Sequence, residues 1–170
     1  DDELFIPRIS GIPSLSDFEG MEPQTEIAHS MAKVGEFIQR TPNDGAQPTQ
    51  RTDVYVGYNQ THLFAVWLAF DSEPELIRAN LASRENINGD DRVGLTIDTF
   101  NDQRTAVSFH STPLGIQWDA RWTEGSSIRA GFDTSFEAVW ESDGKLTDQG
   151  YMVWMSIPLR SLRFREAQEQ

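Results

Sequence analysis

The sequence predicts an all-β protein: an antiparallel β-sandwich of two packed sheets, with one or two short helical turns. Its five Trp, three Tyr and ten Phe residues lie mostly in short runs that alternate with period two. Gly, Asn, Asp or Pro separates these runs, and several gaps are short enough for hairpins, whereas parallel strands need long crossovers. Because 170 residues suit one core, residues 1–170 are expected to form a single domain.

The first two strands are expected at Thr52–Tyr58 and Leu63–Phe70, which three residues join as a hairpin. The second of these runs is apolar on both parities, so we expect a central strand that is covered on both faces. Before them, Met21–Met31 is a candidate short helix. After them, Ser72–Ser83 begins like a capped helix and then alternates, which predicts one helical turn followed by a strand.

The middle of the chain predicts three more antiparallel strands. Arg92–Phe100 alternates through apolar residues, and a short turn leads it into Thr105–Ser111. A turn with Pro113 and Gly115 then leads into Ile116–Thr123, where apolar and polar residues alternate as in a strand with one face in water.

The last two strands are expected at Phe136–Glu141 and Tyr151–Ile157. Between them, the pair Asp143-Gly144 is typical of a tight turn.

Composition excludes several functions. The chain has 14 basic and 27 acidic residues, a net charge of −13, and this opposes binding to nucleic acid, which depends on Lys and Arg. A cation or a neutral ligand such as a sugar fits the negative charge better. The favoured alternative is that the charge only makes the surface soluble. The chain has no cysteine, which excludes disulfides, thiolate zinc sites and cysteine nucleophiles. No HExxH, GxSxG or phosphate-loop motif is present, so an enzyme is not expected.

Membrane and export signals are also missing from the sequence. The longest apolar run, Leu63–Phe70, is far shorter than the roughly 20 residues that span a bilayer. No signal peptide is visible at Asp1, which is compatible with a cytoplasmic chain or with a chain whose signal has been removed.

Several phrases of the sequence occur together in one known family. They are RTPNDGAQPTQRTDVYVGY, LAFDSEP, GDDRVGLTIDTFNDQRTAVSFHSTPLG, FEAVWE and DQGYMVWMSIPLRSLRF. In order and spacing, residues 35–164 resemble the N-terminal domain of large bacterial envelope proteins of uncharacterised function. That domain is similar to family 9 carbohydrate-binding modules.

The resemblance implies a β-sandwich that binds an oligo- or polysaccharide between aromatic rings without catalysis, often with structural Ca²⁺. It also implies export to the periplasm, outer membrane or exterior of a Gram-negative bacterium. The chain would then be either a domain of a longer protein with an attached outer-membrane barrel or a stand-alone relative. A longer protein of this kind is compatible with the label of a glycoside hydrolase.

The sequence departs from the family pattern at positions that matter for binding. Asn59 stands where the family commonly has Asp, Gly94 where it has an acidic residue, and Trp154 where it has Glu. Family members usually open with an Asp-Gly pair and an acidic residue followed by Trp. The matching region here, RISGIPSLSDFEGM, has no Trp. These departures favour the alternative, a structural or protein-interaction sandwich that has lost sugar binding and serves the barrel.

Four aspartates are candidate calcium ligands, because Ca²⁺ takes six to eight oxygen ligands and these carboxylates lie near expected strand ends. They are Asp98, Asp91, Asp102 and Asp71. The alternative is that Asp71, Asp91 and Asp102 bond local backbone amides in turns, which is a common duty for Asp.

The candidate sugar site combines aromatic platforms with planar polar groups. Trp118, Trp122, Asp119 and Arg121 supply both types on one strand, but the two Trp point to the face opposite the two polar residues. Core burial of Trp118, Trp122 and Trp140 is the favoured alternative, since aromatic residues dominate cores. Trp154 is expected to point outward and to form an exposed apolar patch with Met152, unless residues 4–12 cover it.

Overall fold

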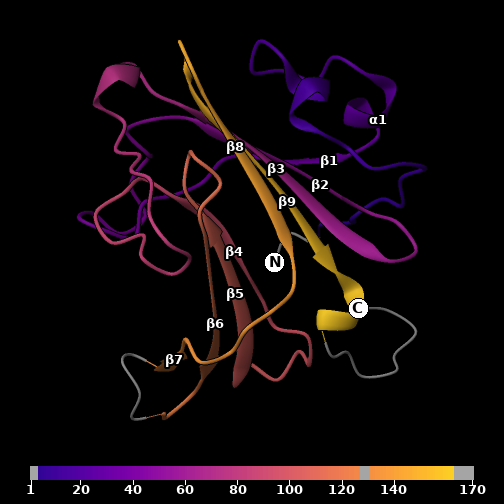
Figure 1. Cartoon of the computed structure of the whole chain (residues 1–170), viewed down its shortest axis with the longest axis vertical. Coiled ribbons are helices and arrows are strands. Elements are labelled where there is room, and N and C mark those ends of the chain that lie inside the picture. Colours follow the sequence, from indigo (N-terminus) through magenta and orange to yellow (C-terminus); the bar gives the residue numbers. More distant parts are fainter. Residues whose placement is uncertain (1–3, 127–130, 163–170) are drawn as a thin grey trace.

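The computed structural model describes residues 4–126 and 131–162, and it confirms the predicted β-sandwich (Figure 1). Two antiparallel sheets, of five and four strands, pack face to face. Arg163 and Phe164, the last residues of the family resemblance, lie outside the described residues.

The five-stranded sheet has the order β1-β2-β3-β9-β8. Its strands are β1 (Ala32–Val34), β2 (Thr52–Tyr58), β3 (His62–Phe70), β9 (Gly150–Pro158) and β8 (Glu141–Thr147). The four-stranded sheet has the order β4-β5-β6-β7. Its strands are β4 (Val93–Ile97), β5 (Thr105–Ser111), β6 (Gln117–Thr123) and β7 (Phe132–Asp133).

Within residues 4–126 and 131–162, helical structure is limited to short segments, as predicted. The α-helix α1 (Glu26–His29) lies inside the segment that was expected to be helical, and the 3₁₀ turn η2 (Pro74–Leu76) follows β3. Two further 3₁₀ turns are η1 (Leu15–Phe18) and η4 (Leu159–Ser161). Within the described part of the chain, no helix has the length and apolar character that crossing a bilayer requires.

The main core lies between the two sheets. It is formed by alternate side chains of each strand, those that point toward the other sheet. Trp67 of β3 and Val153 of β9 point inward from the five-stranded sheet. Val93 of β4 and Phe109 of β5 meet them from the other sheet. Trp140, from the connection that precedes β8, packs edge-on to Phe109 with the ring centroids 5.4 Å apart.

A second buried cluster covers the other face of the five-stranded sheet. The N-terminal segment supplies Ile9, Phe18, Met21, Ala28 and Met31, which pack on Tyr55, Phe64, Val66, Leu68 and Met152. In Figure 1 this segment, with α1, lies on the opposite side of the sheet from β4, β5 and β6. The structure therefore has three layers, and β3 is covered on both faces, which confirms the prediction.

The sequence predictions fail around β8. The expected strand at Phe136–Glu141 has no regular secondary structure before Glu141, the residue at which β8 begins. The expected turn at Asp143-Gly144 lies in the middle of β8. The strand expected within Ser72–Ser83 does not form, although the helical turn does.

Close packing explains why a glycine occupies the middle of β8. A Cβ atom on Gly144 would lie 2.3 Å from the carbonyl oxygen of Pro113 and 2.6 Å from the amide nitrogen of Gly115. Ser142 also donates a hydrogen bond to the carbonyl of Gly115, at 2.8 Å. The turn before β6 therefore docks on β8, and the Asp-Gly pair serves a close approach of two backbones.

Candidate functional site

The outer face of the four-stranded sheet carries an aromatic strip. Residues of β6 alternate, so Trp118 and Trp122 share one face, while Asp119 lies on the face of its cross-strand partner Phe109. Because Phe109 is in the main core, both tryptophans point away from that core. The expectation that favoured their burial between the sheets is therefore wrong, although it is correct for Trp140.

Four partly exposed rings make up the strip, which we define as His110, Trp118, Trp122 and Phe132. The ring centroid of Trp118 lies 5.0 Å from that of His110 and 5.9 Å from that of Phe132. Trp122 is the cross-strand partner of Phe132. These contacts hold the rings next to one another on β5, β6 and β7.

Gly94 makes room for one end of the strip. A Cβ atom on Gly94 would lie 2.6 Å from the imidazole of His110, so a larger residue would displace the ring. Burial, together with the charge of Arg92, lowers the pKa of His110 to about 4. The imidazole is therefore neutral at pH 7. Beside it, the hydroxyls of Thr96 and Ser108 share a hydrogen bond of 2.7 Å, and Thr96 is exposed.

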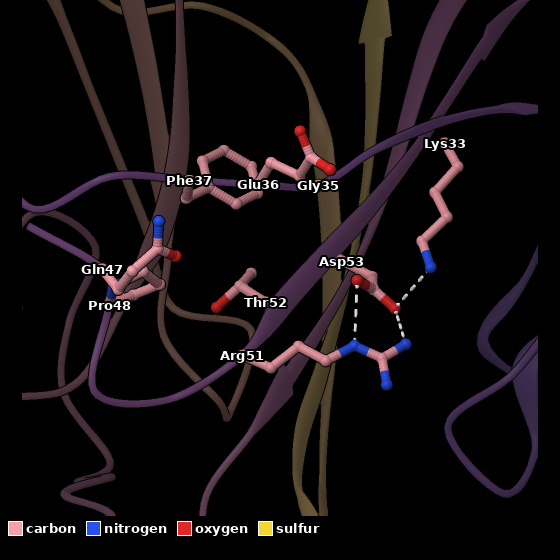
Figure 2. A pocket seen from close by; sticks show the side chains of 9 residues that line it. All are labelled: Lys33, Gly35, Glu36, Phe37, Gln47, Pro48, Arg51, Thr52 and Asp53. Carbon is pink, nitrogen blue, oxygen red and sulfur yellow. Dashed lines mark hydrogen bonds and ion pairs between the residues drawn. The ribbon is translucent and has the colours of Figure 1, made fainter.

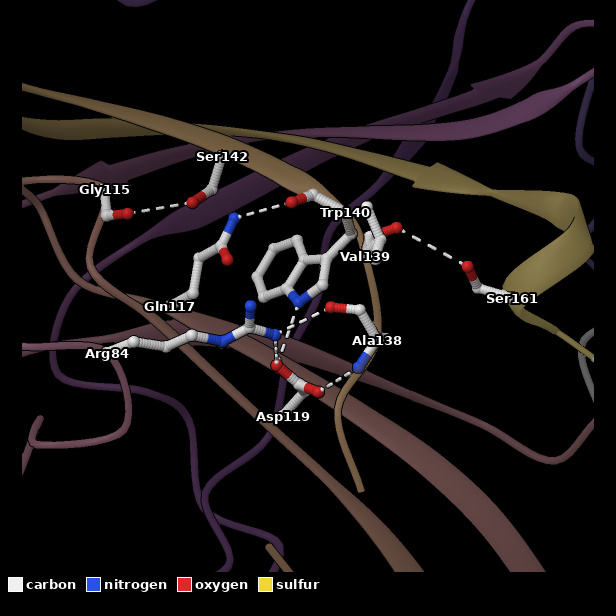
Figure 3. Close-up of polar contacts among 9 residues, drawn as sticks. All are labelled: Arg84, Gly115, Gln117, Asp119, Ala138, Val139, Trp140, Ser142 and Ser161. Carbon is white, nitrogen blue, oxygen red and sulfur yellow. Dashed lines mark hydrogen bonds and ion pairs between the residues drawn. The ribbon is translucent and has the colours of Figure 1, made fainter. Parts of the chain in front are cut away.

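Asp119 is fully buried on the core side of β6 (Figure 3). Its oxygens accept hydrogen bonds from the amide of Ala138 at 2.8 Å and from the indole nitrogen of Trp140 at 3.0 Å. Arg84 adds an ion pair and also donates to the carbonyl of Ala138 at 2.7 Å. Asp119 therefore fastens the chain before β8 to the sheet, in a position where no ligand at the surface reaches it.

Arg121 and Gln117 also use the inward face of β6. The guanidinium carbon of Arg121 lies 4.8 Å from the ring centroid of Phe136, and Arg121 is exposed. Gln117 donates a hydrogen bond to the carbonyl of Trp140 at 2.9 Å (Figure 3). The structure thus separates the tryptophans from the polar residues of the same strand, as the alternation predicts.

Trp154 lies under the N-terminal layer. It is partly buried against the second cluster, and Met152 is almost completely buried there. The indole nitrogen of Trp154 is buried and has no hydrogen-bond partner among the described residues. Of the two alternatives for Trp154, the exposed patch with Met152 is therefore wrong, and cover by the N-terminal segment is correct. Residues Ile9–Met31 form the cover, rather than residues 4–12 alone.

The four candidate calcium ligands lie in loops and bind backbone amides. Asp98 accepts from Phe100 and Gln103, at 3.0 and 2.7 Å, and chiefly the bond from Gln103 lowers its pKa. Asp102 accepts from Arg104 and Thr105.

The remaining two aspartates make similar contacts. Asp71 accepts from the amide of Glu73 at 2.8 Å, and Asp91 accepts from that of Arg78 at 2.7 Å. In the described ranges, no group of three His, Cys, Asp or Glu residues could hold a metal ion. The structure therefore does not bring three of these acids together, and calcium binding stays a prediction.

A groove of about 750 Å³ lies at the β1 edge of the five-stranded sheet (Figure 2). Its lining comes from β1, the start of β2 and the loop between them: Lys33, Gly35, Glu36, Phe37, Gln47, Pro48, Arg51, Thr52 and Asp53. This groove has no signal in the sequence, because its charged residues come from two separate segments that form no binding motif. His110 and Phe132 were not predicted to bind a ligand either, since neither belongs to a tryptophan-rich run.

Comparison with known proteins gave no match, either to protein-family models or to curated proteins.

Proposed function

We propose that this protein is a non-catalytic carbohydrate-binding domain that holds an oligo- or polysaccharide on the aromatic strip. One observation carries the proposal: Trp118 and Trp122 point away from the core on one face of β6 and are partly exposed. Phe132 and His110 extend this face on the neighbouring strands.

The chemistry of the strip suits a sugar. Aromatic rings offer an apolar surface to the CH face of a pyranose, and an indole N–H or a hydroxyl can bond the rim of the ring. Thr96 supplies such a hydroxyl next to the strip. His110 is neutral, so the strip carries no charge at pH 7 and suits a neutral glycan.

The cellular setting of the proposal rests on the family resemblance. A domain of this kind would work outside the cytoplasm, at the envelope of a Gram-negative bacterium, joined to an outer-membrane barrel. Asp119 has no place in the proposed contacts, because its carboxylate is used inside the fold. Arg121 lies on the opposite face of β6, and Trp154 lies under the N-terminal layer on the other sheet, so neither belongs to the strip.

The test is a glycan-binding screen, followed by calorimetry with the best ligand. Trp118→Ala and Trp122→Ala should each weaken binding at least about tenfold, or about 1.4 kcal/mol, because each removes a platform. Phe5→Ala is the matched control, since Phe5 is 86% exposed and lies outside the strip. Unchanged thermal stability in the tryptophan variants would separate lost binding from lost folding.

The second candidate function is protein interaction, as a sandwich that has lost sugar binding. The large apolar side chains exposed elsewhere favour it, among them Phe5, Leu81 at 89% and Val139 at 74%. If no glycan binds at millimolar protein, the carbohydrate proposal is overturned and this candidate replaces it. If a glycan binds equally well to both tryptophan variants, the ligand lies elsewhere on the surface.

A further inference from the structure

The groove at the β1 edge is built around a buried acid that holds two cations. Asp53 is only 4% exposed, and its carboxylate binds Lys33 at 3.0 Å and both Nε and Nη2 of Arg51 (Figure 2). Burial by itself raises the pKa of Asp53, but the hydrogen bonds from Arg51 and Lys33 outweigh this and lower it. The carboxylate is therefore ionised and fixes both cations.

The cations keep hydrogen-bond donors for a ligand. The Lys33 side chain is 47% exposed and that of Arg51 is 63% exposed, although each binds Asp53. An ammonium has three N–H donors and a guanidinium has five, so these bonds leave several donors unused. The ring of Phe70, 4.6 Å from the guanidinium carbon, further restrains Arg51. By contrast, the oxygens of Asp53 already accept three hydrogen bonds.

The remaining walls point to an organic ligand of small size. Phe37 and Pro48 form an apolar side, while Gln47 and Thr52 add neutral polar groups. Figure 2 shows Glu36 pointing away from Thr52 and Arg51, so donors dominate this part of the groove. A volume of about 750 Å³ is typical of small-molecule sites, which range from roughly 300 to 1,000 Å³.

We propose that this groove binds a small organic carboxylate, independently of the aromatic strip. The carboxylate accepts hydrogen bonds from Arg51 and Lys33. The organic part extends along the groove, round the sheet edge, toward Pro48 and toward Phe37, which is partly buried against the main core. A buried acid that holds two cations in place prepares the site for an anion, since little side-chain freedom is left to lose on binding.

Amide chemical shifts in the unmodified protein provide the primary test. The probes are D-glucuronate and N-acetylalanine, each paired with a neutral counterpart, D-glucose and N-acetylalanine amide. We expect a carboxylate to shift the amides of Gly35, Gln47 and Thr52 at millimolar concentrations, and the neutral counterparts to leave them unmoved. Shifts with D-glucuronate identify the ligand as an acidic sugar, and shifts with N-acetylalanine identify it as an acylated amino acid. Absence of shifts there, or equal shifts with the neutral probes, overturns the proposal.

Variants then assign the donors. Arg51→Gln and Lys33→Gln should each weaken carboxylate binding at least about tenfold. Lys145→Gln is the matched control, because it removes the same charge from β8, at the opposite edge of the sheet. Retained affinity in both groove variants overturns the assignment. A glucuronate effect on amides of the strip, rather than of the groove, would support the carbohydrate proposal and contradict this one.

Discussion

At the scale of single residues, Asp119 shows how a polar side chain can hold a β-sandwich together. It lies on the core face of β6, where sequence patterns lead one to expect an apolar residue. The amide of Ala138, the indole of Trp140 and the guanidinium of Arg84 satisfy its oxygens. Three segments far apart in the sequence therefore meet at one carboxylate.

We predict that Asp119→Ala destabilises the protein by about 3 kcal/mol, because it leaves buried donors without an acceptor. This value is at the lower end for a broken buried pair, since the Arg84 side chain is 40% exposed and can regain water. Urea denaturation gives the free energy of unfolding. The control, Asp143→Ala, removes an exposed carboxylate bound to the adjacent amide of Gly144 and should change stability by about 0.5 kcal/mol at most. A loss below about 1 kcal/mol for Asp119→Ala would contradict the structural role.

His110 makes stability depend on pH. Its pKa is lowered from 6.5 to about 4 in the folded protein, so on acidification the unfolded chain takes up a proton first. The stabilisation is complete above pH 6.5 and is lost as pH falls toward 4, by up to about 3 kcal/mol. Unfolding free energies of the parent protein and of His110→Gln, measured across this range, should diverge in slope. Parallel slopes would show that the imidazole does not resist protonation.

At the scale of elements, alternation alone predicts β2, β3, β5, β6 and β9 to within one or two residues. Each of these strands has several apolar residues in a period of two or a continuous apolar run. β1 and β7 were missed, because three and two residues are too short to show a period.

The errors have tertiary causes. Phe136–Glu141 alternates like a strand, yet its aromatic residues fold over Arg121 and Asp119 instead of pairing with a neighbouring strand. Asp143-Gly144 has the composition of a turn, but the approach of Pro113 to β8 is what requires the glycine.

The orientation of β6 was the hardest feature to predict. Because two tryptophans and one aspartate lie on opposite faces of β6, the sequence suggests that the tryptophans face the core. In the structure Asp119 faces the core and the tryptophans point away from it. Arg84 makes the burial of Asp119 possible, because it pairs with the carboxylate from a loop that lies 35 residues earlier in the sequence. Such a long-range pairing leaves no local pattern. The aromatic strip therefore emerges only from the registers of β5, β6 and β7.

At the scale of the whole molecule, the five-stranded sheet belongs to two cores at once. Alternate residues of β3 and β9 enter the main core and the cluster under the N-terminal layer. Detachment of that layer would expose Phe64, Leu68 and Met152 to water and weaken the same strands that hold the two sheets together. We therefore expect the layer and the sandwich to unfold as one cooperative unit.

Phe18→Ala tests this cooperativity. Phe18 is completely buried, and its ring centroid lies 5.0 Å from that of Tyr55, so the variant should lose about 3–5 kcal/mol. In urea, tryptophan fluorescence reports on the sheets, while proteolysis within residues 9–31 reports on the N-terminal layer. Coincident midpoints are expected, both shifted to lower urea. If proteolysis in the layer began well before the fluorescence changed, the layer would be a separate unit, and the outer face of β3 and β9 would be open to partners when it detached.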